Sequence, residues 1–136
     1  MSITNSIISS MLKRIIIVDD DDDFLHFVAT MIKVHCPAAF VQLAHDGSEA
    51  MAFISRGTPP SVVITDIAMP RLDGNALCRM VREQHGDRVK IIAMTASRLS
   101  VDATFDAIVS KPFSIDALFA VIDQALDDQE TSIVHS

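Results

Sequence analysis

Short apolar runs alternate along the chain with segments of mixed polarity, and this pattern predicts the order of strands and helices. Apolar runs predict buried strands at residues 15–18, 40–44, 61–65, 89–94 and 107–110. Apolar residues at helical spacing follow four of these strands, within residues 24–32, 48–54, 77–81 and 115–126. Strands that alternate with helices indicate an α/β fold with a doubly wound, five-stranded parallel sheet.

The ends of the helices are marked by residues with known end preferences. Pro37 stops the first helix, Gly57 follows the second, and Gly86 ends the third. Ser48 is the predicted N-cap of the second helix, and Ser114 is that of the last. These signals separate the helices from their neighbouring strands.

The segment between the last two strands departs from this alternation. Residues 97–106 have weak helical periodicity. They also include several Ser, Thr and Asp residues, whose side chains compete with a helix for backbone hydrogen bonds. We expect the fourth helix to be short or replaced by an irregular loop.

A run of five aspartates, residues 19–23, follows the first strand without a spacer. In open α/β sheets, ligands bind at the carboxyl ends of the strands. Carboxylates crowded at that edge repel one another, and a hard divalent cation offsets the repulsion. The strand-end position therefore favours Asp19 and Asp20 as metal ligands. For residues 21–23 we favour a solvated helix start, because Asp is common in caps and first turns.

Polar residues also follow three of the other strands: Asp66, Thr95 and Lys111. Taken singly, each has an ordinary explanation, as a cap for Asp66 or Thr95 and as a surface lysine for Lys111. Together with Asp19 and Asp20, they predict a convergent pocket of three carboxylates, one hydroxyl and one ammonium. Such a pocket suits the handling of a phosphoryl group on a carboxylate nucleophile.

The bulk composition narrows the class of protein. A chain of 136 residues, 49% of them hydrophobic, suits one globular domain, which we place at residues 12–127. Residues 1–11 are expected to form a flexible N-terminal extension and residues 128–136 a flexible C-terminal tail. The formal net charge of −7 gives no support for binding to nucleic acid or to an anionic membrane surface.

The cysteines and histidines give no further signal. With two cysteines, no signal-peptide pattern and no apolar run of membrane-spanning length, the sequence indicates a cytoplasmic protein with free thiols. The five histidines lack a recognised metal-binding spacing and are expected on the surface or at helix ends.

Four sequence motifs, taken together, resemble the receiver domain of response regulators, the phosphoacceptor module of two-component signalling. They are IIIVDD at residues 15–20, DIAMP at 66–70 followed by DG at 73–74, MTA at 94–96 and SKPF at 110–113. The resemblance spans about residues 12–127 and implies a flavodoxin-like receiver fold. Gly74 is interpreted as a turn residue with unusual backbone angles.

The resemblance implies a role for each residue of the pocket. Asp66 would accept a phosphoryl group from a phosphohistidine. Lys111 would neutralise one phosphoryl oxygen, and Thr95 would donate a hydrogen bond to another. The implied ligands of Mg²⁺ (or Mn²⁺) are Asp20 and Asp66 directly, Asp19 through water, and the backbone carbonyl of Ala68. The family also usually has a cis peptide between this lysine and the proline after it.

Two features depart from the family pattern. Thr95 and Lys111 are 16 residues apart in the chain. This is roughly six fewer than is typical and would remove nearly two turns of the fourth helix. Ile108 stands where receivers usually carry an aromatic residue that moves inward with the threonine. Both features lie on the face that most receivers use to dimerise or signal, so we expect the usual output coupling to be altered.

The expected function is a stand-alone, cytoplasmic response regulator phosphorylated by a sensor histidine kinase or a phosphotransfer protein. It would signal by protein contact or act as a phosphate sink. It would be a signalling domain rather than an enzyme, although it would assist its own phosphotransfer and dephosphorylation. No nucleic-acid or membrane partner is expected.

Two alternatives remain open. One is an interaction module with the receiver fold whose binding does not depend on phosphorylation; the altered fourth-helix region and Ile108 motivate it. The other is a metal-dependent phosphohydrolase that uses the same carboxylates, although the sequence shows no insertion that would form a substrate pocket.

Overall fold

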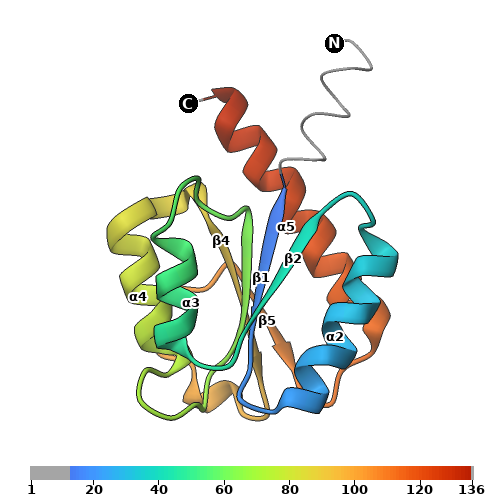
Figure 1. Cartoon of the computed structure of the whole chain (residues 1–136), viewed down its shortest axis with the longest axis vertical. Helices are drawn as coiled ribbons and strands as arrows, with labels where there is room; N and C mark the ends of the chain where they lie inside the picture. Colours follow the sequence, from blue (N-terminus) through green and yellow to red (C-terminus); the bar gives the residue numbers. More distant parts are fainter. Residues whose placement is uncertain (1–12, 136) are drawn as a thin grey trace.

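The computed structural model describes residues 13–135 (Figure 1), so the predicted N-terminal extension lies outside the described residues. The elements, in chain order, are β1 (Arg14–Val18), α2 (Asp22–His35), β2 (Phe40–Ala44), α3 (Gly47–Ile54), β3 (Val62–Asp66), α4 (Gly74–His85), η1 (Gly86–Arg88), β4 (Lys90–Thr95), η2 (Arg98–Ser100), β5 (Ala107–Ser110) and α5 (Ile115–His135). The short elements η1 and η2 are single 3₁₀ turns. The five predicted strands are all present, and each starts and ends within one residue of its predicted limits.

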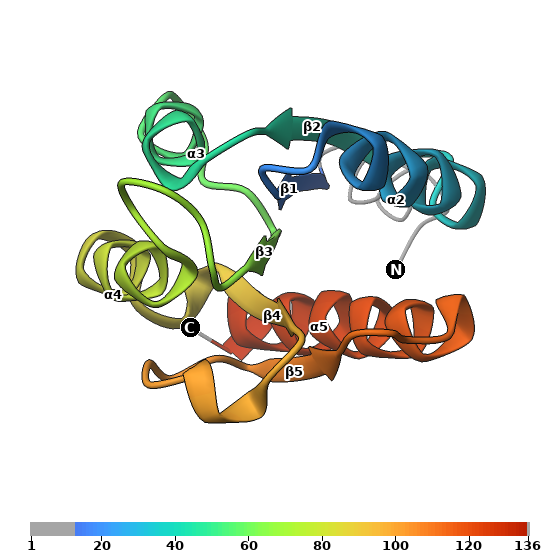
Figure 2. The ribbon, with the colours of Figure 1, turned by 90° about the horizontal axis from the view of Figure 1, so that it is seen from below.

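The five strands form one parallel sheet with the order β2-β1-β3-β4-β5. Helices α2 and α5 cover one face of the sheet, and α3 and α4 cover the other (Figure 2). The chain runs outward from β1 in one direction to β2 and in the other to β3. The predicted doubly wound fold is therefore confirmed, with its switch point between β1 and β3.

Both faces of the interior strand β1, which lies between β2 and β3, are buried, as its continuous apolar run predicted. Ile15 and Ile17 pack in the layer with α2 and α5, whereas Ile16 and Val18 pack in the layer with α3 and α4. All four side chains have no solvent exposure. Burial of each contributes roughly 1.5–3 kcal/mol relative to exposure, so this short strand anchors both layers of the core.

Two predicted helix starts are confirmed. The Asp21 carboxylate accepts a hydrogen bond from the Phe24 N–H at 3.2 Å, which makes Asp21 the N-cap of α2. Ser114 precedes α5, and its hydroxyl accepts a hydrogen bond from the Ala117 N–H at 3.1 Å. The second part of the aspartate run therefore starts a solvated helix, as expected.

The predicted cap of α3 is wrong by two residues. Asp46, not Ser48, is the N-cap, and its carboxylate accepts a hydrogen bond from the Glu49 N–H at 2.8 Å. Asp46 has the extended backbone of a cap residue, so the helix starts at Gly47 and already contains Ser48. Asp and Ser are both good caps, and the backbone conformation decides between them.

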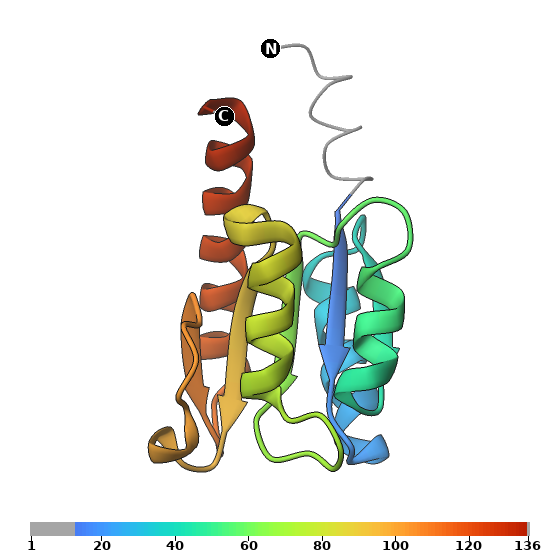
Figure 3. The same cartoon turned by 90° about the vertical axis from the view of Figure 1, so that its left-hand side faces the viewer.

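The helix that would connect β4 to β5 is absent, and the described chain forms only the turn η2 there (Figure 3). Asn75, in the first turn of α4, holds this segment. Its side-chain nitrogen donates to the Ser100 carbonyl at 2.8 Å, and its side-chain oxygen accepts from the N–H groups of Asp102 (3.0 Å) and Ala103 (3.2 Å). The predicted irregular path is confirmed, and the Asn75 side chain fixes its course.

The C-terminal end of the chain differs from its prediction. Helix α5 continues through His135, beyond the sheet (Figure 1), where a tail was predicted from residue 128. No Gly or Pro follows Leu126, and a Gln124–Asp128 hydrogen bond of 2.9 Å joins successive turns. The prediction stopped near Leu126 because the periodic spacing of apolar residues follows only the part of the helix that packs on the sheet. Although α5 is long, none of the helices in the described chain is apolar enough to cross a membrane.

Gly74 lies where α4 meets the carboxyl end of β3. Its N–H donates to the Ile67 carbonyl at 2.9 Å, and a Cβ at this position would lie 2.9 Å from Ile67 Cα and closer still to the Asp66 carbonyl oxygen. The glycines with positive φ among residues 13–135 are Gly57 and Gly86. The predicted unusual backbone angle at Gly74 is therefore wrong, and close backbone approach explains the glycine instead.

We expect Gly74→Ala to lower the free energy of unfolding by more than about 2 kcal/mol, because the new Cβ would meet backbone atoms. Gly57→Ala is the control. Its Cβ would have no neighbour within 4 Å, but its φ of +64° costs a side chain roughly 1–2 kcal/mol. Urea denaturation measures both losses. A smaller loss for Gly74→Ala than for Gly57→Ala would contradict the close-approach explanation.

Candidate functional site

Four strands deliver the predicted site residues to one edge of the sheet, at the lower end of Figure 1. Asp19 follows β1, Asp66 is the last residue of β3, Thr95 is the last of β4, and Lys111 follows β5. Because all strands run in the same direction, residues at their carboxyl ends meet without any long loop.

Three carboxylates converge at this edge. The side chains of Asp19, Asp20 and Asp66 each place an oxygen within 4.8 Å of the others. Asp19 is only 1% exposed, whereas Asp20 is exposed to solvent. One oxygen of Asp19 accepts a hydrogen bond from the Asp21 N–H at 2.9 Å. The structure therefore brings together the acidic residues that the sequence predicted as metal ligands.

Lys111 provides a cation beside these carboxylates. Its Nζ lies 3.0 Å from Asp19 Oδ2 and 3.7 Å from Asp66 Oδ2. The ammonium also lies over the Phe24 ring, 4.3 Å from its centroid, and Phe113 meets Phe24 edge to face at 6.0 Å. The peptide between Lys111 and Pro112 is cis, as the resemblance implied. Lys111 is thus held in place by an aromatic face and by Asp19.

Phe24 was not predicted as a site residue. Its apolar character assigned it only to the buried stripe of the first helix. A signal was present in the sequence, since Phe24 directly follows the aspartate run and Phe113 lies two residues after Lys111. The contact between them depends on how α2 and the β5–α5 connection pack together, which the spacing alone does not define.

The electrostatic balance at Asp66 is unfavourable for its charged form. Burial is the main cause that raises the pKa of this carboxyl above its ordinary value. The Lys111 ammonium opposes the rise in pKa, and so does the hydrogen bond from the Ile67 N–H to Asp66 Oδ1 at 2.8 Å. The charges on Asp19 and Asp20 add to the rise.

The donor set fits a hard divalent cation. Three carboxylates face the ammonium of Lys111, and the candidate ligand atoms that they offer are all oxygens. Mg²⁺ prefers oxygen ligands and keeps several waters, which the exposure of Asp20 allows. Asp19 already bonds Lys111 and a backbone N–H, so it is the least available of the three for direct ligation.

Thr95 and Ala68 lie at the same edge of the sheet, beside the carboxylates. The Thr95 hydroxyl donates to the Ser97 carbonyl at 2.9 Å and accepts from the Ser97 N–H at 3.1 Å, so it is bonded to the loop after β4. The Thr95 carbonyl accepts from the Lys111 N–H at 2.7 Å, which joins the two motifs through the backbone. Ala68 is exposed two residues beyond Asp66, and the role of its carbonyl stays a prediction.

The surface beside Lys111 carries no aromatic residue at position 108. Ile108 is half-buried there. Arg98 of η2 crosses this region, and its side chain donates to the Ser110 hydroxyl at 2.9 Å and to the Ile108 carbonyl at 3.4 Å. The short turn that replaces the fourth helix is therefore joined to β5 by a guanidinium.

The family model described as the response regulator receiver domain matches residues 15–123. A curated relative, the response regulator MprA of Mycobacterium leprae (strain TN), is 37% identical over 107 residues. The match covers 71% of this chain and 46% of that protein, so the chain spans about half the length of this relative. The expectation of a stand-alone regulator stays a prediction.

Solved structures agree with this match. A CheY-like response regulator receiver domain protein from Methanospirillum hungatei JF-1 is 28% identical, with a TM-score of 0.79 over 89% of this chain and 98% of that one. The response regulator TrrA from Thermotoga maritima, solved in complex with Mg²⁺–BeF, is 26% identical, with a TM-score of 0.72 over 85% of this chain and 100% of that one. The chain belongs to the response regulator receiver domain family.

Proposed function

We propose that Asp66 accepts a phosphoryl group from the phosphohistidine of a sensor histidine kinase or a phosphotransfer protein. The observation that carries this proposal is the orientation of the Asp66 carboxylate. Its Oδ1 accepts a hydrogen bond from the Ile67 N–H, and its Oδ2 faces the Lys111 ammonium. Oδ2 is then the attacking oxygen; the P–N bond breaks and the imidazole nitrogen keeps the electron pair.

A divalent cation, Mg²⁺ or Mn²⁺, would be held by Asp20 and Asp66 directly, by Asp19 through water, and by the backbone carbonyl of Ala68. When bound, it would neutralise charge on the phosphoryl oxygens. The Mg²⁺–BeF complex of the similar protein TrrA supports the presence of a divalent cation. The bonds that Asp19 already makes support its indirect role.

The remaining roles belong to side chains of this chain. Lys111 stabilises a second phosphoryl oxygen, because its ammonium already lies between Asp19 and Asp66. The Thr95 hydroxyl would exchange its bond to the Ser97 carbonyl for a bond to the phosphoryl group. That exchange would release one contact of the loop that leads into η2 and so would transmit the chemical state of Asp66.

We place the protein in the cytoplasm, as a signalling domain rather than an enzyme, that assists its own phosphotransfer and dephosphorylation. It would act through a protein partner or as a phosphate sink. The net charge of −7 supports a protein partner over a nucleic acid.

A second candidate function is a phosphorylation-independent interaction module. The observation that favours it is the network around η2, in which Asn75 and Arg98 already fix the segment between β4 and β5. If this network does not respond to Asp66, partner capture will be the same for the wild type and for Asp66→Asn. A phosphorylation-dependent regulator will lose or gain capture with that substitution.

Asp66→Asn tests the site directly. We expect the wild type, incubated with acetyl phosphate and Mg²⁺, to gain the mass of one acid-labile phosphate. The variant should gain none, because an amide oxygen is a poor nucleophile. Chelation of the cation should also prevent the gain. Asp87→Asn, in the exposed turn η1, is the matched control and should gain mass like the wild type.

Uptake of the same phosphate by Asp66→Asn would refute the site. If the wild type takes up no phosphate even from a phosphorylated kinase, the interaction module becomes the better explanation.

The raised pKa of Asp66 gives a prediction about stability. In a chelating buffer at neutral pH, the wild type carries a partly buried charge that Asp66→Asn removes, so the variant should melt at a higher temperature than the wild type. Protonation of Asp66 in the wild type removes the same unfavourable charge. The advantage of the variant should therefore shrink as the pH falls through the raised pKa and should vanish near the ordinary carboxyl pKa of about 4.

Thermal melts across this pH range, with and without Mg²⁺, measure the effect. Mg²⁺ should stabilise the wild type more than the variant, because the variant lacks one carboxylate ligand. A variant that melts below the wild type in chelator at neutral pH would show that the Asp66 charge is well compensated.

A further inference from the structure

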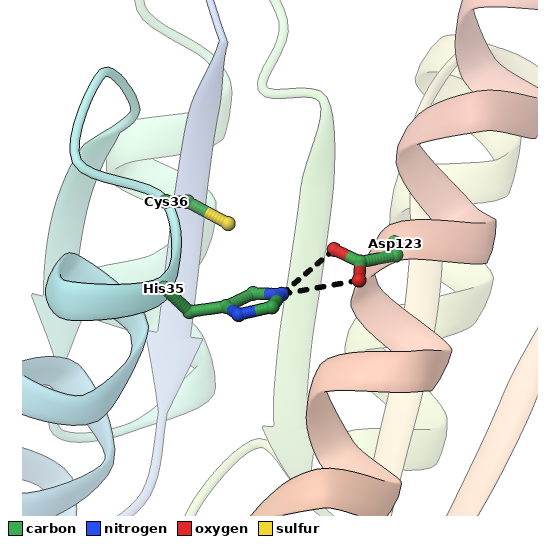
Figure 4. A group of neighbouring side chains, drawn as sticks. All are labelled: His35, Cys36 and Asp123. Atoms are coloured by element: carbon green, nitrogen blue, oxygen red, sulfur yellow. Dashed lines mark hydrogen bonds and ion pairs between the residues drawn. The ribbon is translucent and has the colours of Figure 1, made fainter.

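Three side chains with different donor atoms converge at the other end of α2. His35 is the last residue of α2, Cys36 is its C-cap, and Asp123 comes from α5. Each offers one ligand atom within 4.8 Å of the others (Figure 4). The cluster combines an imidazole nitrogen, a thiol sulfur and a carboxylate oxygen, and the proposed phosphorylation chemistry uses none of them.

The imidazole of this cluster is held in position by α5. His35 Nε2 lies 2.9 Å and 3.1 Å from the two carboxylate oxygens of Asp123. Its ring stacks on Phe119, with centroids 4.0 Å apart and an interplanar angle of 5°. Phe119 and Asp123 are one helical turn apart, so one face of α5 sets both the plane and the direction of the imidazole.

The thiol is fixed through its backbone. The Cys36 N–H donates to the Ile32 carbonyl at 2.7 Å, and the Cys36 carbonyl accepts from the Ala39 N–H at 3.1 Å. Both bonds anchor the residue at the turn between α2 and β2. Figure 4 shows the Cys36 side chain directed into the space between α2 and α5, toward His35 and Asp123.

We propose that His35, Cys36 and Asp123 bind a divalent transition metal of the zinc class, which joins α2 to α5. Nitrogen, sulfur and oxygen donors together suit Zn²⁺ or Co²⁺, whereas Mg²⁺ requires oxygen ligands. Three protein ligands leave a fourth tetrahedral position for water.

Only small movements are needed to close the site. Metal–sulfur bonds of about 2.3 Å and metal–nitrogen or metal–oxygen bonds of about 2.0–2.2 Å require donor atoms roughly 3.3–3.7 Å apart in a tetrahedron. The His35–Asp123 pair at 2.9 Å would open slightly, and Sγ would approach the pair. His35 is 27% exposed and Asp123 56%, so both side chains have room to adjust and the ion has a way in.

Binding also changes the state of the thiol. Burial raises the pKa of Cys36, Asp123 adds to the rise, and Lys13 opposes it, so the free protein holds a thiol. Metal binding breaks the S–H bond, forms a metal–sulfur bond and releases the proton to water. The positive metal then offsets the repulsion between the thiolate and the Asp123 carboxylate.

This cluster is separate from the carboxylate site. The two lie near opposite ends of the 14-residue helix α2, a separation of about 20 Å at 1.5 Å per residue. Their donor atoms differ as well, so hard and borderline cations distinguish them. The competing explanation is a simple ion pair between His35 and Asp123 that closes the α2–α5 contact without a metal.

Addition of Co²⁺ to the reduced, full-length protein in excess Mg²⁺ decides between the two. We expect thiolate-to-cobalt charge-transfer absorption in the near ultraviolet, which carboxylate ligands alone cannot produce. Zn²⁺ should abolish this absorption by displacing cobalt, since it binds such sites more tightly. Cys36→Ser should remove it, and Cys78→Ala, which deletes the other thiol, should leave it intact.

Two further variants keep the test independent of the cysteine. His35→Gln and Asp123→Asn, both at solvent-accessible positions, should each weaken Co²⁺ binding at least about tenfold while leaving the circular dichroism spectrum unchanged. The proposal is overturned if the wild type shows no charge-transfer absorption, if the absorption survives Cys36→Ser, or if Zn²⁺ fails to displace the cobalt.

Discussion

The candidate site depends on the parallel register of four adjacent strands, β1, β3, β4 and β5. Val18 lies opposite Thr65, Asp66 opposite Met94, and Thr95 opposite Ser110. Asp66 and Thr95 are therefore the last residues of their strands, and Asp19 and Lys111 are the first residues beyond theirs. A slip of one position in any of these strands would turn its site residue to the other face of the sheet and expose its apolar neighbours. The packing of the core therefore keeps the site residues in place.

The same edge of the sheet connects the site to the segment that replaces the fourth helix. Gly74 touches the backbone of Asp66 and Ile67, and the next residue, Asn75, holds the chain at Ser100 and beyond. From the other side, Thr95 bonds Ser97. The irregular segment is thus bonded near its start by Thr95 and in its middle by Asn75. A regular helix would satisfy its own backbone, whereas this segment depends on side chains from α4, the helix that begins against the backbone of Asp66.

Sequence patterns predicted most of this structure because burial on both faces leaves an unmistakable signature in a short strand. The site residues followed at once, since they are adjacent in sequence to those strands. Where prediction failed, the pattern of apolar and polar residues did not contain the deciding information. The cap of α3 depended on a backbone angle at Asp46, and the polar end of α5 had no apolar stripe to mark it. The contact between Phe24 and Lys111 and the approach of Asp123 to Cys36 both depend on how helices pack, which spacing along the chain does not encode.

The charge arrangement at the carboxylate site leaves its carboxylates incompletely compensated. Three carboxylates face one ammonium, and burial of Asp66 makes its charge costly, so the site alone is electrostatically unsatisfied. Lys111 cannot correct this by itself, because it lies closer to Asp19 than to Asp66. Under the proposed function, the cation and the phosphoryl group would each change the net charge at this site. Water would screen that change only in part, because the site is partly buried. Under the same proposal, the change would be relieved by hydrogen bonds that can exchange partners, such as the pair that joins Thr95 to Ser97 at the start of the irregular segment.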